Sequence, residues 1–167
     1  MEAAASHTIA RGDGEHIPLG GLDIIFKITS DQTGGALAIC ETVVEPGRLI
    51  PVHVHDTEDE FTYVIDGRIG ALIGEQELTA EPGTWVLKPR GIPHTFWNPG
   101  SKQARTIEII TPAGFENFFR DISGIFNADG PPDLERLTST AARYRHHFRP
   151  DLDQPLMHKH NLRVIGT

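Results

Sequence analysis

Four side chains that can bind a metal lie in two short segments, and their spacing constrains the fold more than any other feature. The segments are residues 47–67 and 83–98, and the side chains are His53, His55, Glu60 and His94. Side chains alternate along an extended strand, so His53 and His55 project from the same face. A single histidine in a strand is usually a hydrogen-bonded structural residue, but four such groups together favour a shared metal ion. The sequence therefore predicts one metal site built from these residues.

Local patterns indicate how the four residues meet. Glu60 opens a β-branched and aromatic run that ends at a turn formed by Asp66 and Gly67. We expect a hairpin to return the chain antiparallel and to place Glu60 beside the histidines. His94 follows a turn over residues 89–93, so it must arrive from a separate strand.

Three further acids, Asp56, Glu58 and Asp59, precede Glu60 in the chain. We expect them to be solvated loop residues. If the register of the loop differs, Asp59 or Glu58 would replace Glu60 as the carboxylate ligand.

The spacing of glycine, proline, histidine and glutamate in both segments matches the two signature motifs of the cupin family. This resemblance implies a mainly β fold, a small double-sheet β-barrel of jelly-roll type. Residues 57–61, 89–94 and 111–115 also resemble the single-domain bacterial cupins related to quercetin 2,3-dioxygenase. That second resemblance covers roughly residues 34–120.

The donor set restricts the metal without identifying it. Three imidazoles and one carboxylate suit one divalent transition metal ion, namely Fe, Mn, Ni, Cu, Co or Zn, whereas Mg and Ca prefer oxygen ligands. Four protein ligands leave at least one position open for water, substrate or dioxygen. The resemblance further implies that Glu60 has a catalytic role, both ligating the metal and accepting a proton from the substrate hydroxyl.

Strand parity predicts the residues around the ion. Thr62 and Val64 share the inward face with Glu60, and Phe96 shares it with His94. These three residues form the predicted substrate pocket, which suits a flat, apolar or aromatic ligand that coordinates through oxygen. Phe96 and Val64 could equally serve to fill the barrel core.

Composition limits the partners and the compartment. The chain has 167 residues and a formal net charge of -8, which argues against binding to nucleic acid or to anionic membranes. We therefore expect a small-molecule substrate. The lone cysteine, Cys40, excludes an intrachain disulfide and favours a reducing compartment. Residues 1–16 lack a signal-peptide pattern, and no uninterrupted apolar run approaches the length of a membrane span, so we expect a cytoplasmic protein.

Turn residues divide the chain into short strands, as expected for a sandwich or barrel. The predicted strands are residues 22–28, 35–45, 68–73, 76–80, 84–87, 94–97 and 104–111. We predict a mobile N-terminal arm over residues 1–20, the cupin β-barrel over residues 21–112, and C-terminal helices and a tail over residues 113–167 that pack on the barrel.

The period of the apolar residues changes after residue 114, which predicts a C-terminal helical extension. The first helix carries an apolar stripe formed by Phe115, Phe118, Phe119, Ile122, Ile125 and Phe126. A turn over residues 127–130 ends it, and a second helix begins near Pro131. We expect the two helices to cap one mouth of the barrel or to form a dimer element.

Four histidines lie in the tail after residue 144. His158 and His160 repeat the spacing of the first motif, but no carboxylate strand follows them, so we expect no metal there. The outward apolar residues of the run 61–65 require cover, and together with the resemblance they predict a homodimer.

The predicted function is that of a metal-dependent dioxygenase acting on a small phenolic or enolic, flavonol-like substrate, as the resemblance implies. Two alternatives remain open. One is a non-redox isomerase, cyclase or decarboxylase that uses the metal as a Lewis acid. The other is a binding module that holds metal and ligand without turnover.

Overall fold

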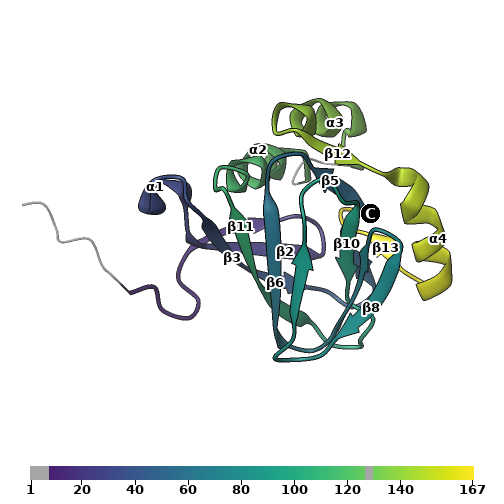
Figure 1. The fold of residues 1–167 in the computed structure, drawn as a ribbon. Coiled ribbons are helices and arrows are strands. Elements are labelled where there is room, and N and C mark those ends of the chain that lie inside the picture. The colour runs from purple at the N-terminus through teal and green to yellow at the C-terminus, as the bar shows by residue number, and fades with distance from the viewer. Residues whose placement is uncertain (1–7, 127–129) are drawn as a thin grey trace, which may run out of the picture.

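Two β-sheets face each other in the computed structural model, which describes residues 8–126 and 130–167 (Figure 1). The first sheet has the order β1-β2-β3-β11-β6-β9. Its strands are β1 (Glu15–Pro18), β2 (Leu22–Ile28), β3 (Ala38–Val44), β6 (Asp59–Asp66), β9 (Trp85–Lys88) and β11 (Ala104–Thr111). Its pairings are antiparallel.

The second sheet has the order β12-β5-β10-β4-β13, and β7 joins it by pairing with β10 and with β8. Its strands are β4 (Arg48–Leu49), β5 (His53–His55), β7 (Ile69–Ile73), β8 (Gln76–Ala80), β10 (His94–Trp97), β12 (His146–Phe148) and β13 (Arg163–Val164). The mainly β, double-sheet architecture that the sequence predicts is therefore confirmed.

Side chains alternate between the interior and the outside along the strands that form the site. On β6, Thr62 and Val64 are fully buried, whereas the alternate residues Phe61 and Tyr63 are partly exposed. The inner apolar side chains of the two sheets form one core, which extends beneath the C-terminal helices. This agrees with the period of two used to predict the inward faces.

The predicted hairpin between the histidine strand and the glutamate strand is wrong. β5 pairs with β10 and β12, whereas β6 pairs with β11 and β9, so the two strands belong to different sheets. Both edges of β6 are occupied, and no edge is left for β5. Glu60 therefore faces the histidines across the barrel interior rather than from a neighbouring strand.

Glycine conformations account for the strand start that was misplaced by the most residues. The strand predicted from residue 35 begins at Ala38, because Gly34 and Gly35 adopt φ of 62° and 83° after the short helix α1 (Ser30–Thr33). The left-handed region suits glycine and ends the helix before the strand starts.

The predicted N-terminal arm includes a paired strand. Within residues 1–20, β1 lies antiparallel to β2, and the side chain of Leu19 is buried. Residues 1–7 lie outside the described part of the chain.

Two helices follow the barrel as predicted, α2 (Glu116–Phe126) and α3 (Leu134–Arg143). They lie over one end of the two sheets (Figure 1). The apolar stripe of α2 faces the core through Phe118, Ile122 and Ile125. The turn predicted over residues 127–130 falls mostly on residues 127–129, which lie outside the described residues.

The tail is more ordered than its sequence indicates. It forms β12, then α4 (Pro150–His160), then β13. A second apolar cluster joins Leu156 of α4 and Leu162 to Trp97, so α4 covers the outer face of the second sheet. Within the described residues, none of the helices has the length and apolar character that a membrane span needs.

Candidate metal and substrate site

The four predicted ligands meet inside the barrel. One possible ligand atom from each of His53, His55, Glu60 and His94 lies within 4.8 Å of the others, and all four residues are buried. His53 and His55 lie on β5, and His94 stands opposite His53 on the neighbouring strand β10. Glu60 comes from β6 on the facing sheet. Two sheets thus contribute ligands to one point.

Backbone carbonyls orient two of the imidazoles. The Nδ1 atom of His53 lies 2.7 Å from the carbonyl oxygen of Pro51, and Nδ1 of His94 lies 2.9 Å from that of Ile92. A carbonyl oxygen can only accept, so both Nδ1 atoms carry the proton and both Nε2 atoms are left with a lone pair. The Nε2 atom of His94 and both ring nitrogens of His55 are buried without a hydrogen-bond partner in the described part of the chain.

Unpartnered buried nitrogens are costly unless a ligand satisfies them. Hydrogen bonds that fix the far nitrogen of a histidine are typical of metal sites. The donor set of three neutral imidazoles and one carboxylate therefore fits a divalent transition metal ion. Burial favours the neutral rings, since it lowers the pKa of His53 well below its usual value and also lowers the pKa of His94.

Glu60 is an anion held between the histidines and a lysine. Its Oε1 lies 3.5 Å from Nε2 of His55, and its Oε2 lies 3.4 Å from Nε2 of His94 and 2.8 Å from Nζ of Lys88. Burial alone would raise the pKa of Glu60, but Lys88 and the two imidazoles outweigh burial and hold the pKa well below its usual value. Glu60 is therefore suited to binding a cation.

A buried lysine and a second carboxylate extend the site, and sequence reasoning missed both. Lys88 on β9 donates to Glu108 on β11 at 2.7 Å as well as contacting Glu60. Glu108 also accepts hydrogen bonds from Thr62 and Thr106, each at 2.8 Å. Burial raises the pKa of Glu108, while the pKa of Lys88 is raised against the effect of its own burial by the two carboxylates. Both residues could have been predicted from the sequence, because each is a charged residue at an inward position of an otherwise apolar strand.

The acids before Glu60 differ from one another. Glu58 is buried, with 8% of its surface exposed, and its Oε2 lies 3.5 Å from Nδ1 of His55, so the expectation of a solvated residue is wrong there. Asp59 instead accepts hydrogen bonds from Arg90, which lower its pKa to about 2. Asp56 is exposed. Of these three acids, therefore, only Glu58 lies beside the ring of a predicted ligand, at Nδ1 of His55.

A fourth histidine, His146, joins the group and was not singled out from the sequence. It lies on β12, opposite His55 in the neighbouring strand, and it is only 4% exposed. Its ring centroid lies 4.7 Å from that of His53 and 4.9 Å from that of His55. His158 and His160 lie on α4, and neither belongs to the buried ligand group. No local spacing links residue 146 to the first motif, so only the fold reveals it.

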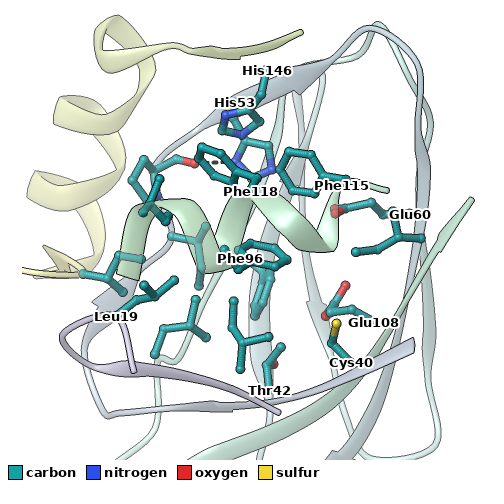
Figure 2. Close-up of a pocket in the computed structure, with 18 of the residues that line it drawn as sticks. Leu19, Cys40, Thr42, His53, Glu60, Phe96, Glu108, Phe115, Phe118 and His146 are labelled. Atoms are coloured by element: carbon teal, nitrogen blue, oxygen red, sulfur yellow. Dashed lines mark hydrogen bonds between the residues drawn. The ribbon is translucent and has the colours of Figure 1, made fainter. Parts of the chain in front are cut away.

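Two of the four ligands, His53 and Glu60, line a largely apolar cavity, which has His53 and His146 at one end and Thr42 and Cys40 at the other (Figure 2). It holds ≈ 720 Å³ of empty space, counting the part open to solvent. Its apolar lining comes from both sheets and the C-terminal helices and includes Leu19, Leu22, Ile24, Ile50, Phe96, Ile110, Phe115, Phe118, Phe119, Ile122, Phe126, Leu137 and Phe148. None of the α2 residues in this lining was among the predicted pocket residues.

The three predicted pocket residues occupy different positions. Phe96 lines the cavity. Thr62 points into the barrel but donates to Glu108, and Val64 packs in the core, so neither reaches the cavity surface. Parity identified the inward face correctly, but it does not separate the core from the cavity wall.

Comparison with known proteins finds a family match over most of the barrel. Residues 40–110 match the family model described as Cupin domain. The curated relatives include Polyketide synthase CurC of Streptomyces cyaneus, 25% identical over 89 residues, and Protein SchB of Streptomyces halstedii, 30% identical over 89 residues. Both alignments cover 53% of this chain, and they span only 56% and 63% of the relatives' own lengths.

Solved structures agree on the fold. A predicted oxalate decarboxylase from Thermotoga maritima has a TM-score of 0.60 at 12% identity, covering 63% of this chain and 98% of that one. A cupin-superfamily sugar phosphate isomerase from Silicibacter pomeroyi has a TM-score of 0.54 at 21% identity, covering 62% of this chain and 74% of that one. At these identities the likeness concerns the fold and not the reaction.

Proposed function

We propose, from the premise that this barrel is a cupin domain, that the chain is a metal-dependent enzyme for apolar phenolic or enolic small molecules. One observation supports this above the others. Two of the four proposed ligands, His53 and Glu60, line a cavity whose remaining surface is mainly aromatic and aliphatic, and they group with His55 and His94, whose buried ring nitrogens have no partner among the described residues. Such a site suits a ligand with an apolar body and an oxygen at one edge.

His53, His55, Glu60 and His94 would hold the ion. A bound divalent ion supplies Lewis acidity, which lowers the proton affinity of a phenol or enol oxygen. The low pKa of Glu60 favours its role as a ligand, because a weakly basic carboxylate is a poor proton acceptor. The proposed catalytic proton transfer to Glu60 would therefore require the carboxylate to bind the ion weakly.

Aromatic side chains define the proposed substrate volume. Phe96 lies on the barrel wall, and Phe115 and Phe118 cover it from the side of α2. Phe115 packs edge-on against the ring of His55, with 4.2 Å between centroids. These side chains would stack against a flat substrate and exclude water from its oxygen.

Insertion of dioxygen is the reaction that we propose first, as in the quercetin 2,3-dioxygenase-like cupins that the sequence resembles. The second candidate is a non-redox isomerisation, cyclisation or decarboxylation of an enolic substrate, and the relative named Polyketide synthase CurC is compatible with it because polyketides are rich in enolisable carbonyl groups. A binding module without turnover is the third candidate. All three share the same metal and the same substrate class.

Turnover under controlled oxygen separates these candidates. Protein loaded with iron, manganese or nickel is mixed with 3-hydroxyflavone or catechol, and oxygen uptake and product formation are followed. Oxygen consumption coupled to product supports the dioxygenase. Anaerobic product formation supports the non-redox reaction, and a thermal shift without product supports the binding module.

Metal binding itself has a direct test. Elemental analysis of protein purified without added metal should give one transition metal ion per chain, and His94→Ala should lower the content to substoichiometric levels. His147→Ala is the matched control, because His147 is exposed and hydrogen-bonds with Asp56 outside the ligand group. Full metal retention in His94→Ala would contradict the site.

A homodimer is also part of the proposal. The edge strand β9 exposes Trp85 and Leu87, with 57% and 54% of their surfaces accessible, and Ile65 of β6 is 38% exposed. The rings of Tyr63 and Trp85 pack together at 4.7 Å between centroids. This outward apolar face would be covered by a second copy, and sedimentation equilibrium of the purified chain tests it.

A further inference from the structure

The ring of His146 is buried at the cavity and lacks the partner that a buried polar group normally has. Its Nδ1 atom is inaccessible and makes no hydrogen bond within the described residues. The residue is 4% exposed and lines the cavity beside His53. An unsatisfied nitrogen in an apolar wall is costly unless something that enters the cavity satisfies it.

The backbone fixes this ring in place from both sides. Arg145 adopts φ of 52°, and its carbonyl oxygen accepts the N–H of Asp56 at 3.1 Å. The side chain of His147, the residue after His146, takes no part in this docking, because it lies at the surface and hydrogen-bonds there with the exposed carboxylate of Asp56 at 3.0 Å. Arg149 then donates its N–H to the carbonyl of Val52 at 2.7 Å. The strand β12 is therefore docked at both ends, and its inward side chain is His146.

The other polar groups of the cavity are already engaged. Thr42 hydrogen-bonds with a neighbouring threonine at 2.7 Å. Glu60 and Glu108 share Lys88, and the Nδ1 of His53 donates to a backbone carbonyl. Among the described histidine, lysine, carboxylate and threonine side chains lining the cavity, His146 is the one outside the proposed ligand set whose polar atom lacks a partner.

We propose that His146 is a substrate-binding residue that hydrogen-bonds a second oxygen of the substrate, next to the oxygen that binds the metal. The inference rests on the proposed function and narrows its substrate class to molecules with two neighbouring oxygens, such as catechols and hydroxyketones. The ring centroid of His146 lies within 5 Å of the ring centroids of His53 and His55. Two oxygens on adjacent carbons of the substrate can therefore reach the metal and His146 at the same time. A second oxygen directed elsewhere would face carbon atoms along most of the wall.

Two probes with one carbon skeleton test this contact. 2,3-Dihydroxynaphthalene carries both oxygens, and 2-naphthol carries one. Their dissociation constants are measured by fluorescence titration on zinc-loaded protein, because zinc is redox-inert and prevents oxidative turnover. The proteins compared are the wild type, His146→Leu, His146→Gln and the control His147→Leu, each checked for zinc content and thermal melting.

The expected result is selective. His146→Leu should weaken binding of 2,3-dihydroxynaphthalene about tenfold or more, while 2-naphthol changes by less than about twofold. His146→Gln, which keeps a hydrogen-bonding group, should restore part of the difference and also serves if the leucine variant folds poorly. His147→Leu should change neither constant, and zinc content should stay at one per chain in all variants.

Other results would overturn the proposal. If both probes bind more weakly to the same extent, His146 acts only in packing. If the His146 variants lose zinc, His146 is a metal ligand. If the binding of both probes is unchanged in the His146 variants, His146 does not take part in substrate recognition. If zinc-loaded wild-type protein binds neither probe, the proposed substrate class fails, and the inference about His146 fails with it.

Discussion

The two sides of the barrel interior differ in how their polar groups are satisfied. The charged wall, consisting of Glu60, Lys88 and Glu108, lies on the first sheet, and each of these side chains contacts another member. The imidazole wall lies on the second sheet and consists of His53, His55, His94 and His146. Ring nitrogens of His55, His94 and His146 are buried there, and no described residue forms a hydrogen bond with them.

This difference separates what the folded chain completes by itself from what it leaves for a ligand. Buried polar groups in folded proteins nearly always have partners. The charged wall meets this rule with its own residues, whereas the imidazole wall meets it only when something else binds. Glu60 belongs to the charged wall and also faces the imidazole wall, so it links the two.

The largest expected effect comes from breaking the charged wall. Lys88→Met keeps an unbranched side chain but leaves two buried carboxylates without their cation. Removal of one partner from a buried ion pair destabilises a protein by about 3–5 kcal/mol. We expect a loss of this size in urea denaturation of the metal-free protein, with part of it recovered on adding a divalent metal beside Glu60.

An exposed ion pair supplies the control for that experiment. Lys159 contacts Glu77 at 2.9 Å, but its side chain is 61% exposed, so solvent screens the pair. Lys159→Met should leave the denaturation midpoint nearly unchanged. A similar small change for Lys88→Met would show that the charged wall does not stabilise the fold.

The imidazole wall should make the metal-free protein sensitive to acid. Burial lowers the folded-state pKa of His53, His94 and His146, so the unfolded chain binds more protons than the folded chain below its own histidine pKa. Stability is therefore complete above about pH 6.5 and falls as the pH drops below it, by about 1.4 kcal/mol per pH unit for each ring.

Denaturation in chelator between about pH 6.5 and 5 measures this loss, which approaches about 4 kcal/mol per pH unit if all three rings contribute fully. The carboxylates whose pKa is lowered, including Glu60, lose their contribution only at lower pH, below the usual glutamate range. They therefore do not mask the histidine window, and Glu108, whose pKa burial raises, can offset at most the contribution of one ring by taking up a proton in the folded state. A flat stability profile over that window would contradict the neutral, unpartnered state of the rings.

Local patterns predicted much of this site, because its ligands lie on short strands with clear turns. Alternation along β5 placed His53 and His55 on one face, and parity on β6 and β10 identified the inward neighbours of Glu60 and His94. The two C-terminal helices were recognisable from their apolar period. Each of these inferences depends on residues a few positions apart.

The pairing of strands could not be derived in the same way. β6 follows β5 closely in sequence, yet it pairs with β9 and β11, because partners far along the chain occupy both of its edges. Lys88 and His146 share this problem. Each gains its meaning from residues across the barrel, which no spacing within its own strand reveals.

Glu58 offers the finest test of the imidazole wall. Its Oε2 lies 3.5 Å behind Nδ1 of His55, and its Oε1 accepts a hydrogen bond from Thr57 at 2.7 Å. Carboxylates in this position orient a ligating imidazole and raise its basicity, and their loss typically weakens metal affinity by about 10–100-fold. We expect Glu58→Gln to do so in a competition titration with a chelator, while the stoichiometry stays at one.

Asp59→Asn is the matched control for Glu58→Gln, because Asp59 precedes Glu60 directly but pairs with Arg90 instead of a histidine. It should leave the metal affinity unchanged. If Glu58→Gln and Asp59→Asn have equal metal affinities, Glu58 does not contribute to metal binding. Loss of stoichiometric metal in Glu58→Gln would instead make Glu58 itself a ligand. The imidazole wall would then include a second carboxylate that binds the ion, in addition to Glu60.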